Sequence, residues 1–245
     1  MKAYKIQTDF SNRCQGYSPV MTTVHLPSIR CEVCKRDTGE WDSYHPSMKC
    51  TPRLLAMLKQ CKKAMTVEEF QRVQSKMPAR NRPFGELLPG SQIGLHRIRI
   101  YEPPPDFVLD MNCSIISELA QKILKSEGVK VYTGEVELLY RRKPLQGWRA
   151  VDFPDLRLMT DKSFKASGHT KCPRCGDVSL SKILPAAKLL YGHSDHELTR
   201  ERWPKDLGLA RLCESKWRVP SPEFIRAWKK HKLTGINFVP IGKWV

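Results

Sequence analysis

The stretch KCPRCGDV at residues 171–178 decides how this chain folds, because it places two cysteines three positions apart in a tight turn. The stretch RCEVCKRD at residues 30–37 repeats the pattern, with Lys35 in place of the glycine. Two thiolates at this spacing can bind one metal ion, since the intervening turn points both sulfurs the same way. A glycine after the second cysteine supplies the positive φ that such a turn often needs, so Lys35 must adopt a strained φ or a different turn.

Together the two pairs supply the four ligands of a tetrahedral site, and the first interpretation is one structural zinc bound by Cys31, Cys34, Cys172 and Cys175. The pairs are far apart in the chain, since 172 − 34 gives 138 positions. Loop-closure entropy grows only slowly with loop length, so the separation is no physical objection. If one ion binds both pairs, the middle of the chain is an insertion between two metal-binding turns. Each of these turns, at Cys31–Cys34 and at Cys172–Cys175, is called a knuckle.

Two alternatives stay open for the cysteine pairs. Each pair could bind its own ion, Cys31 and Cys34 with His45 or Cys50, and Cys172 and Cys175 with His169 or His193. Each pair could also be a redox dithiol, although neither has the βαβ context in which such a pair opens a helix. The remaining cysteines are interpreted as small buried apolar residues: Cys14, Cys50, Cys61, Cys113 and Cys213.

The charge of the chain is strongly positive, with 42 Lys and Arg against 25 Asp and Glu, a net +17. Such a field attracts nucleic acid, an anionic membrane surface or an acidic protein face. The basic residues are scattered, without an arginine-rich arm. Some are candidate contact residues, although plain solubilising charge is the commoner role of such side chains: Arg141, Arg142, Lys143, Lys229 and Lys230.

The sequence indicates a protein that folds and stays in the cytoplasm. No segment reaches the roughly 18 apolar residues needed to span a bilayer, and the first residues lack the apolar core of a signal peptide. Nine cysteines, an odd number, favour thiols and metal binding over a disulfide framework.

The pattern of apolar residues predicts an α+β fold with a mixed or antiparallel sheet, plus a zinc-ribbon-like knuckle formed by the two distant CxxC pairs. Helices are predicted at 51–64, 66–77, 114–128 and 221–235, with Thr51, Thr66, Ser114 and Ser221 as N-caps. Strands are predicted at 3–9, 95–101 and 236–242, with one or two strands at 129–142 and a strand or turn at 206–212. The predicted regions are 1–50 with the first knuckle, 51–160 in the middle, and 161–245 with the second knuckle, together forming one compact unit.

A catalytic site is not indicated. His193, Asp195, His196 and Glu197 could form a metal site, but without helical ligand spacing they are interpreted as a solvated polar loop. Nucleophile elbows and phosphate loops are missing, and the order of His169 and the second cysteine pair does not fit a zinc deaminase. A structural zinc and a protein without enzymatic activity are therefore expected. A thiol-dependent enzyme is the least favoured class.

A zinc-ribbon nucleic-acid-binding protein is the main alternative function. Positive charge and six tryptophans could bind phosphates and stack on bases. However, neither a recognition helix behind a knuckle nor a paired aromatic motif is present.

Four segments resemble the double-CxxCG proteins of myxobacteria, a family that includes immunity proteins of the Sit toxin–immunity pairs. They are HLPSIRCEVCK at 25–35, ELLPGSQIG at 86–94, KCPRCGDV at 171–178 and AWKKHKLTGINFVPI at 227–241. The chain departs from the family motif at Lys35, where the family has glycine.

The resemblance implies a cytoplasmic antitoxin that binds and blocks one cognate protein toxin and has no activity of its own. It implies Cys31, Cys34, Cys172 and Cys175 as the metal ligands. The positive field of the chain fits a toxin with an acidic contact surface.

Overall fold

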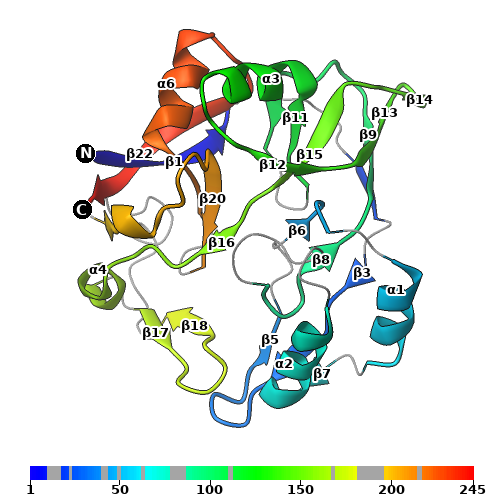
Figure 1. Cartoon of the computed structure of the whole chain (residues 1–245), viewed down its shortest axis with the longest axis vertical. Coiled ribbons are helices and arrows are strands. Elements are labelled where there is room, and N and C mark those ends of the chain that lie inside the picture. Colours follow the sequence, from blue (N-terminus) through cyan, green and yellow to red (C-terminus); the bar gives the residue numbers. More distant parts are fainter. Residues whose placement is uncertain are drawn as a thin grey trace.

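The structure is a computed structural model. It describes residues 1–9, 18–21, 24–39, 44–48, 51–61, 64–77, 87–109, 113–166, 169–180, 196–213 and 217–245. These residues form helices and several small antiparallel and mixed sheets, so the predicted α+β class is confirmed. Figure 1 shows α3 and α6 at one end of the molecule and the two cysteine knuckles at the other.

The two ends of the chain lie together in one sheet. This sheet contains β1 (Lys2–Thr8), β22 (Ile236–Trp244) and β19 (His196–Leu198). β22 lies in the middle, antiparallel to β1 and parallel to β19. The Trp244 N–H also donates to the Met1 carbonyl at 2.7 Å, which ties the last strand to the first residue.

Two helices cover the neighbouring sheet, whose strands are β10 (Phe107–Val108), β11 (Ile115–Ser117), β15 (Trp148–Asp152) and β12 (Tyr132–Gly134). The helices are α3 (Glu118–Ser126) and α6 (Pro222–Lys230). Their apolar faces meet around Phe224, which stacks on Trp228 at 5.3 Å between ring centroids. Burial of these aromatic side chains stabilises this end of the molecule.

Two further sheets complete this end of the molecule. One contains β14 (Lys143–Pro144), β13 (Val136–Tyr140), β9 (His96–Ile100) and β2 (Ser18–Met21). The other contains β16 (Asp155–Leu156), β20 (Leu209–Leu212) and β21 (Arg218–Pro220). Ile98 and Ile100 are fully buried on one face of β9, and the strand predicted at 95–101 is confirmed.

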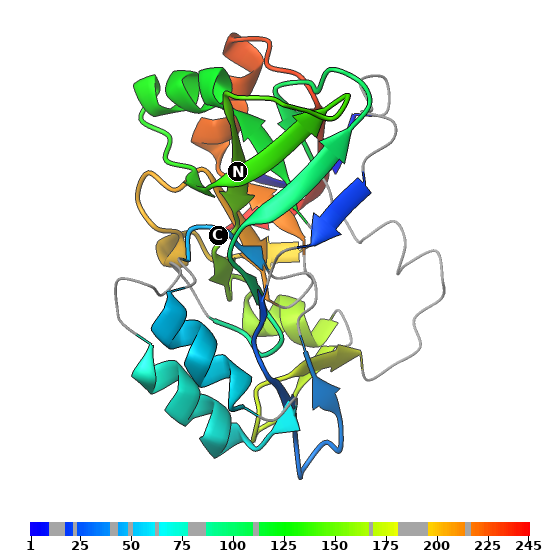
Figure 2. The ribbon, with the colours of Figure 1, turned by 90° about the vertical axis from the view of Figure 1, so that its right-hand side faces the viewer.

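The knuckle end is built from short strands and helices (Figure 2). The first knuckle lies between β4 (Ser28–Arg30) and β5 (Asp37–Thr38), and β7 (Ala64–Met65) joins their sheet. The second lies between β17 (His169–Lys171) and β18 (Val178–Leu180). The other elements here are α1 (Pro52–Lys59), α2 (Val67–Lys76), β3 (Val24–His25), β8 (Gln92–Ile93), β6 (Tyr44–His45) and α4 (Asp161–Ala166).

A short 3-10 helix spans Arg200–Arg202.

Most of the predicted helix starts are confirmed. Thr51, Thr66 and Ser221 each accept a backbone N–H at the start of a helix, and Thr66 forms a full capping box with Glu69. The predicted cap at Ser114 is wrong. Residues 115–117 form β11, which pairs with β10 and β15, and α3 begins only after Ser117.

Strands from different predicted regions pair with each other. β4 pairs with β7, and β3 with β8, across the boundary at residue 50, while β16 pairs with β20 across the boundary at 160. The division at residues 50 and 160 stays a prediction.

A buried ionic network joins β6 to the sheets at the other end of the molecule. His45 Nδ1 lies 3.0 Å from Asp152 Oδ1, and its Nε2 lies 3.7 Å from Asp155 Oδ2. Arg211 donates from Nε to Asp155 at 2.5 Å. All four side chains are at most 2% exposed, so removing one partner would leave a buried charge uncompensated.

The network sets the protonation of His45. Burial is the largest influence and lowers its pKa, but the carboxylates of Asp152 and Asp155 outweigh it, so the pKa is raised above 6.5. A second buried histidine, His96, behaves oppositely, because burial lowers its pKa to about 4.

We predict that His45 gives the protein a falling stability at alkaline pH. A raised folded-state pKa contributes stability that is complete below pH 6.5 and is lost as the pH rises through the folded value. His45→Gln should therefore flatten the pH dependence above 6.5, which urea unfolding of metal-loaded protein between pH 6 and 9 measures. His96→Gln is the control. Because the pKa of His96 is lowered, this substitution should change the pH dependence of stability only at acid pH. Equal alkaline slopes in wild type and His45→Gln would contradict this prediction.

Candidate metal centre

The two knuckles share one backbone design. In the first, Lys35 donates its N–H to the Cys31 carbonyl and Cys31 donates to the Arg36 carbonyl, both at 3.0 Å. In the second, Gly176 donates to Cys172 at 3.0 Å and Cys172 donates to Asp177 at 2.8 Å. Each residue of the second knuckle follows its counterpart in the first by 141 positions. The repeated sequence pattern is thus a repeated turn.

The last position of each turn has a left-handed backbone. Gly176 has φ 73° and Lys35 has φ 59°. Of the two outcomes expected for Lys35, a strained φ or a different turn, the structure has the strained φ, since this region disfavours residues with a Cβ. The first knuckle therefore keeps the turn geometry despite the missing glycine.

The four sulfurs converge although the two pairs lie far apart in sequence. Their Sγ atoms all lie within 4.8 Å of one another. Across the knuckles, Cys31 lies 3.8 Å from Cys172, and Cys34 lies 3.7 Å from Cys175. These distances are far longer than a disulfide bond of about 2.05 Å, and all four are free cysteines. The arrangement can hold a metal ion.

Hydrogen bonds and burial split the pKa values of the four thiols. The N–H of Cys175 is the main cause that lowers the pKa of Cys172 to about 6, and the N–H of Cys34 likewise lowers that of Cys31. Burial is the main cause that raises the pKa of Cys175. The N–H of Arg36 lowers the pKa of Cys34, but burial and neighbouring sulfurs outweigh it and the net shift is upward. A bound cation is needed to keep all four deprotonated together.

The second CxxC pair, rather than a histidine, completes the candidate site at the first pair. His45 lies in the ionic network with Asp152 and Asp155, so it is no ligand of a separate site at Cys31 and Cys34. The His169 side chain, Cys50 and His193 lie outside what the structure describes.

The knuckles are held together by an apolar core and by ion pairs at its edge. Ile29, Leu58 and Phe70 form part of this core, against which Cys34, Cys172 and Cys175 pack. Arg36 approaches Asp177 at 3.7 Å, and Arg174 contacts both Glu32 at 3.3 Å and Glu68. Exposed ion pairs of this kind contribute little each, so apolar packing dominates among these contacts.

The remaining cysteines only partly follow the prediction. Cys113 is buried, whereas Cys61 and Cys213 are half-buried. Cys14 and Cys50 lie outside the described residues.

The polar cluster at 193–197 differs from the expected solvated loop. His196 and Glu197 belong to β19, and His196 is buried against Ser163, whose Oγ lies 3.3 Å from its Nδ1. Glu197 pairs with Lys243 at 3.1 Å. The loop interpretation is wrong for these two residues because β19 pairs with β22. His193 and Asp195 lie outside the described residues.

The candidate basic contact residues are exposed but dispersed. Arg141 and Arg142 form the left-handed turn between β13 and β14, and Lys143 begins β14. Lys229 and Lys230 end α6, where Lys230 pairs with Glu127 at 2.8 Å.

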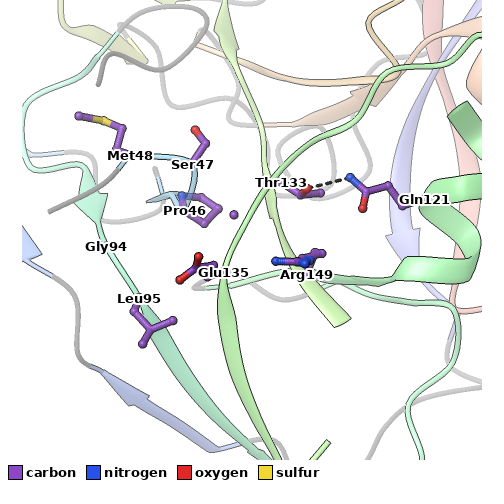
Figure 3. Close-up of a pocket in the computed structure, with 10 residues that line it drawn as sticks. Pro46, Ser47, Met48, Gly94, Leu95, Gln121, Thr133, Glu135 and Arg149 are labelled. Atoms are coloured by element: carbon purple, nitrogen blue, oxygen red, sulfur yellow. Dashed lines mark hydrogen bonds between the residues drawn. The ribbon is translucent and has the colours of Figure 1, made fainter. Parts of the chain in front are cut away.

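A pocket of about 640 Å³ lies between the turn at Pro46–Met48 and the strands β12 and β15 (Figure 3). Its polar wall is largely paired internally: Gln121 donates to Thr133 at 2.8 Å, and Arg149 donates from Nε to Glu118 at 3.0 Å. Ser47 lines the pocket and donates its hydroxyl to Asp152. This places a hydroxyl at the end of the buried ionic network.

The order of groups in this network does not suit nucleophilic catalysis. A serine nucleophile needs a histidine nitrogen to take its proton, with a carboxylate behind the histidine. Here both His45 nitrogens face carboxylates, and the Ser47 hydroxyl faces Asp152 instead. The geometry therefore favours a structural role for the network.

Comparisons with models of known protein families and with curated proteins find no match for this chain. Among the described residues, no helix combines the length and apolar character required to cross a membrane.

We predict that Lys35→Gly stabilises the metal-loaded protein. A residue with a Cβ costs about 1 kcal/mol in the left-handed region, and glycine removes this cost. Part of the gain is offset, because glycine also raises the backbone entropy of the unfolded chain. Denaturant unfolding at constant zinc concentration measures the change.

The matched control is Gly176→Ala, at the equivalent position. An added Cβ there has ordinary contacts, 3.6 Å from Lys171 Cε, so any loss reflects the φ of 73°. This variant should lose stability. Unchanged stability in both variants would show that the two turns do not need their left-handed position.

Proposed function

We propose that this chain is an immunity protein that binds and neutralises a cognate protein toxin in the cytoplasm, on a scaffold held by one structural zinc ion. The observation that carries the proposal is the convergence of Cys31, Cys34, Cys172 and Cys175. These cysteines lie in two of the four segments on which the resemblance to the double-CxxCG proteins rests. A shared ion would make both motifs parts of one structural unit.

Zinc fits the sulfur positions. In a regular tetrahedron with zinc–sulfur bonds of about 2.3 Å, neighbouring sulfurs lie about 3.8 Å apart. Two of the four sulfur–sulfur distances between the knuckles are 3.8 and 3.7 Å, and all four sulfurs lie within 4.8 Å of one another. Four thiolates also fill the coordination shell of zinc, which is typical of structural sites and leaves no position for a reacting water.

A binding role agrees with the remaining chemistry. The serine, aspartate and histidine of the buried network are in the wrong order for nucleophilic catalysis. A rigid scaffold suits a stoichiometric binder, and thiolate ligands suit a reducing compartment such as the cytoplasm. The net charge of +17 would speed association with an acidic toxin face.

The same net charge supports one second candidate, a nucleic-acid-binding protein with a zinc-ribbon-like element. The described basic residues at Arg141–Lys143 and at Lys229 and Lys230 lie on separate elements. They do not form one stripe that could follow a phosphate backbone, so this function ranks second.

We predict that each chain binds about one zinc and that Cys31→Ser and Cys172→Ser both lose it. Because structural zinc binding is coupled to folding, both variants should also melt at lower temperature. Metal analysis and thermal unfolding measure the two effects. Cys113→Ser is the control, since this cysteine lies outside the cluster. Unchanged zinc content in either ligand variant would rule out a joined site.

The immunity role predicts a 1:1 complex of nanomolar affinity, about −12 kcal/mol, with the protein encoded by the neighbouring gene. Co-expression should protect cells from that protein. Titration calorimetry measures the affinity, and growth assays measure the protection. Treatment with nuclease is the control for binding through nucleic acid. Binding to random DNA or RNA with a steep salt dependence, and none to the neighbouring product, would favour the second candidate.

A further inference from the structure

The sulfurs of the candidate metal centre meet in pairs across the two knuckles. Cys31 Sγ lies 3.8 Å from Cys172 Sγ, and Cys34 Sγ lies 3.7 Å from Cys175 Sγ. The two contacts share no cysteine, so two disulfide bonds can form here at the same time. Each sulfur would move by less than about 1 Å to reach the disulfide bond length of about 2.05 Å.

One cysteine of each pair faces a pocket. This second pocket has a volume of about 540 Å³ and lies between α2 and the second knuckle, and its described lining includes Cys172 and Cys175. Both side chains are half-buried, whereas Cys31 is fully buried. A small oxidant that enters the pocket therefore meets the second knuckle first, and the sulfur in contact behind it belongs to the first knuckle.

We propose that the four cysteines are an oxidation site, at which hydrogen peroxide forms two disulfide bonds across the knuckles and releases the bound ion. The bonds are Cys31 with Cys172 and Cys34 with Cys175. The inference rests on the proposed function, because it assigns a regulation to the zinc shared by both knuckles. It does not depend on the identity of the toxin.

Each pair reacts with one molecule of peroxide. The pocket-side thiolate attacks one peroxide oxygen and the O–O bond breaks, so this sulfur becomes a sulfenic acid and hydroxide leaves. The thiolate of the first knuckle then attacks the sulfenic sulfur, forms the S–S bond and expels a second hydroxide. Two thiolates thus lose two electrons, and the peroxide takes these electrons and two protons and becomes two waters. Because thiolates are the metal ligands, disulfide formation at both pairs removes all four.

Loop length favours bonds across the knuckles over bonds within each turn. A cross-knuckle disulfide joins residues 141 positions apart, whereas a bond within one turn joins residues three positions apart. Closing the longer loop removes more conformational freedom from the unfolded chain, so it stabilises the folded protein more. The oxidised protein would therefore lose its zinc and keep the connection between its distant segments.

Peptide mapping of peroxide-treated, full-length protein tests the pairing. Trypsin cuts after lysine and arginine, so the four cysteines lie in the peptides 31–35, 172–174 and 175–182. The predicted bonds join all three peptides into one species, and fragmentation between Cys31 and Cys34 should leave Cys31 on the peptide 172–174. Bonds within each knuckle would leave the peptide 31–35 separate, and this result would overturn the inference. So would a bond between Cys31 and Cys175.

Zinc release gives the stoichiometry. A chromogenic chelator should detect one ion released for about two peroxides consumed, and reduction with a dithiol followed by added zinc should restore the starting metal content. Peroxide that leaves the zinc in place contradicts the inference. The matched controls are Cys61→Ser, which lies in the apolar core beside the knuckles, and Cys113→Ser. Both should give the wild-type linked peptides and the wild-type zinc release, and a loss of the linked species in either would contradict the assigned pairs.

Thermal unfolding separates the new bonds from the ion. Oxidised, zinc-free protein should melt above reduced, zinc-free protein by roughly 5 °C or more, because the disulfides hold the knuckles together. Equal melting temperatures would show that oxidation does not connect the two knuckles.

Failure of this inference is distinguishable from failure of the proposed function. Zinc that resists peroxide, or disulfides within each knuckle, would overturn the oxidation site and leave the shared zinc and the immunity role standing. Wild-type protein that binds no zinc would instead remove the shared ion, and the peptide map of the oxidised chain would still decide the pairing.

Discussion

Four thiol groups within 4.8 Å of one another are the constraint on which the knuckle end of this molecule depends. Four thiolates this close together would repel each other, and burial favours the protonated form of Cys175 by raising its pKa. A divalent cation turns this repulsion into attraction, since it binds each sulfur at once. The apolar core around Ile29 and Phe70 would then need only to position the two turns, and a bound ion would join them.

The shared ion would act over a long stretch of chain. It would close a loop of more than 130 residues, and each doubling of loop length adds only about 0.6 kcal/mol to the closure cost. Two other connections also hold together segments that are distant in the sequence. β1 and β22 pair along their length, and the His45 network joins β6 to β15, β16 and β20. A metal ion at the four cysteines would thus add to these connections between distant segments.

The sequence predicted what depends on local chemistry. Thr66 caps its helix because its hydroxyl and Glu69 satisfy nearby backbone groups, and Lys35 takes the left-handed φ that its turn requires. It could not show that Ser117 caps α3 in place of Ser114, because strand pairing with β15 decides that boundary. The residues of the buried ionic network follow no regular spacing in the sequence, so no periodic pattern predicts them. Two carboxylates in the apolar run AVDFPDLRL, residues 150–158, are the signal that could have found Asp152 and Asp155.

X-ray absorption at the zinc edge on the full-length protein tests the central claim most directly. The account predicts a single metal per chain with four sulfur neighbours at about 2.3 Å and no lighter ligand. A shell that contains histidine nitrogen or a water oxygen, or two metal ions per chain, would contradict it.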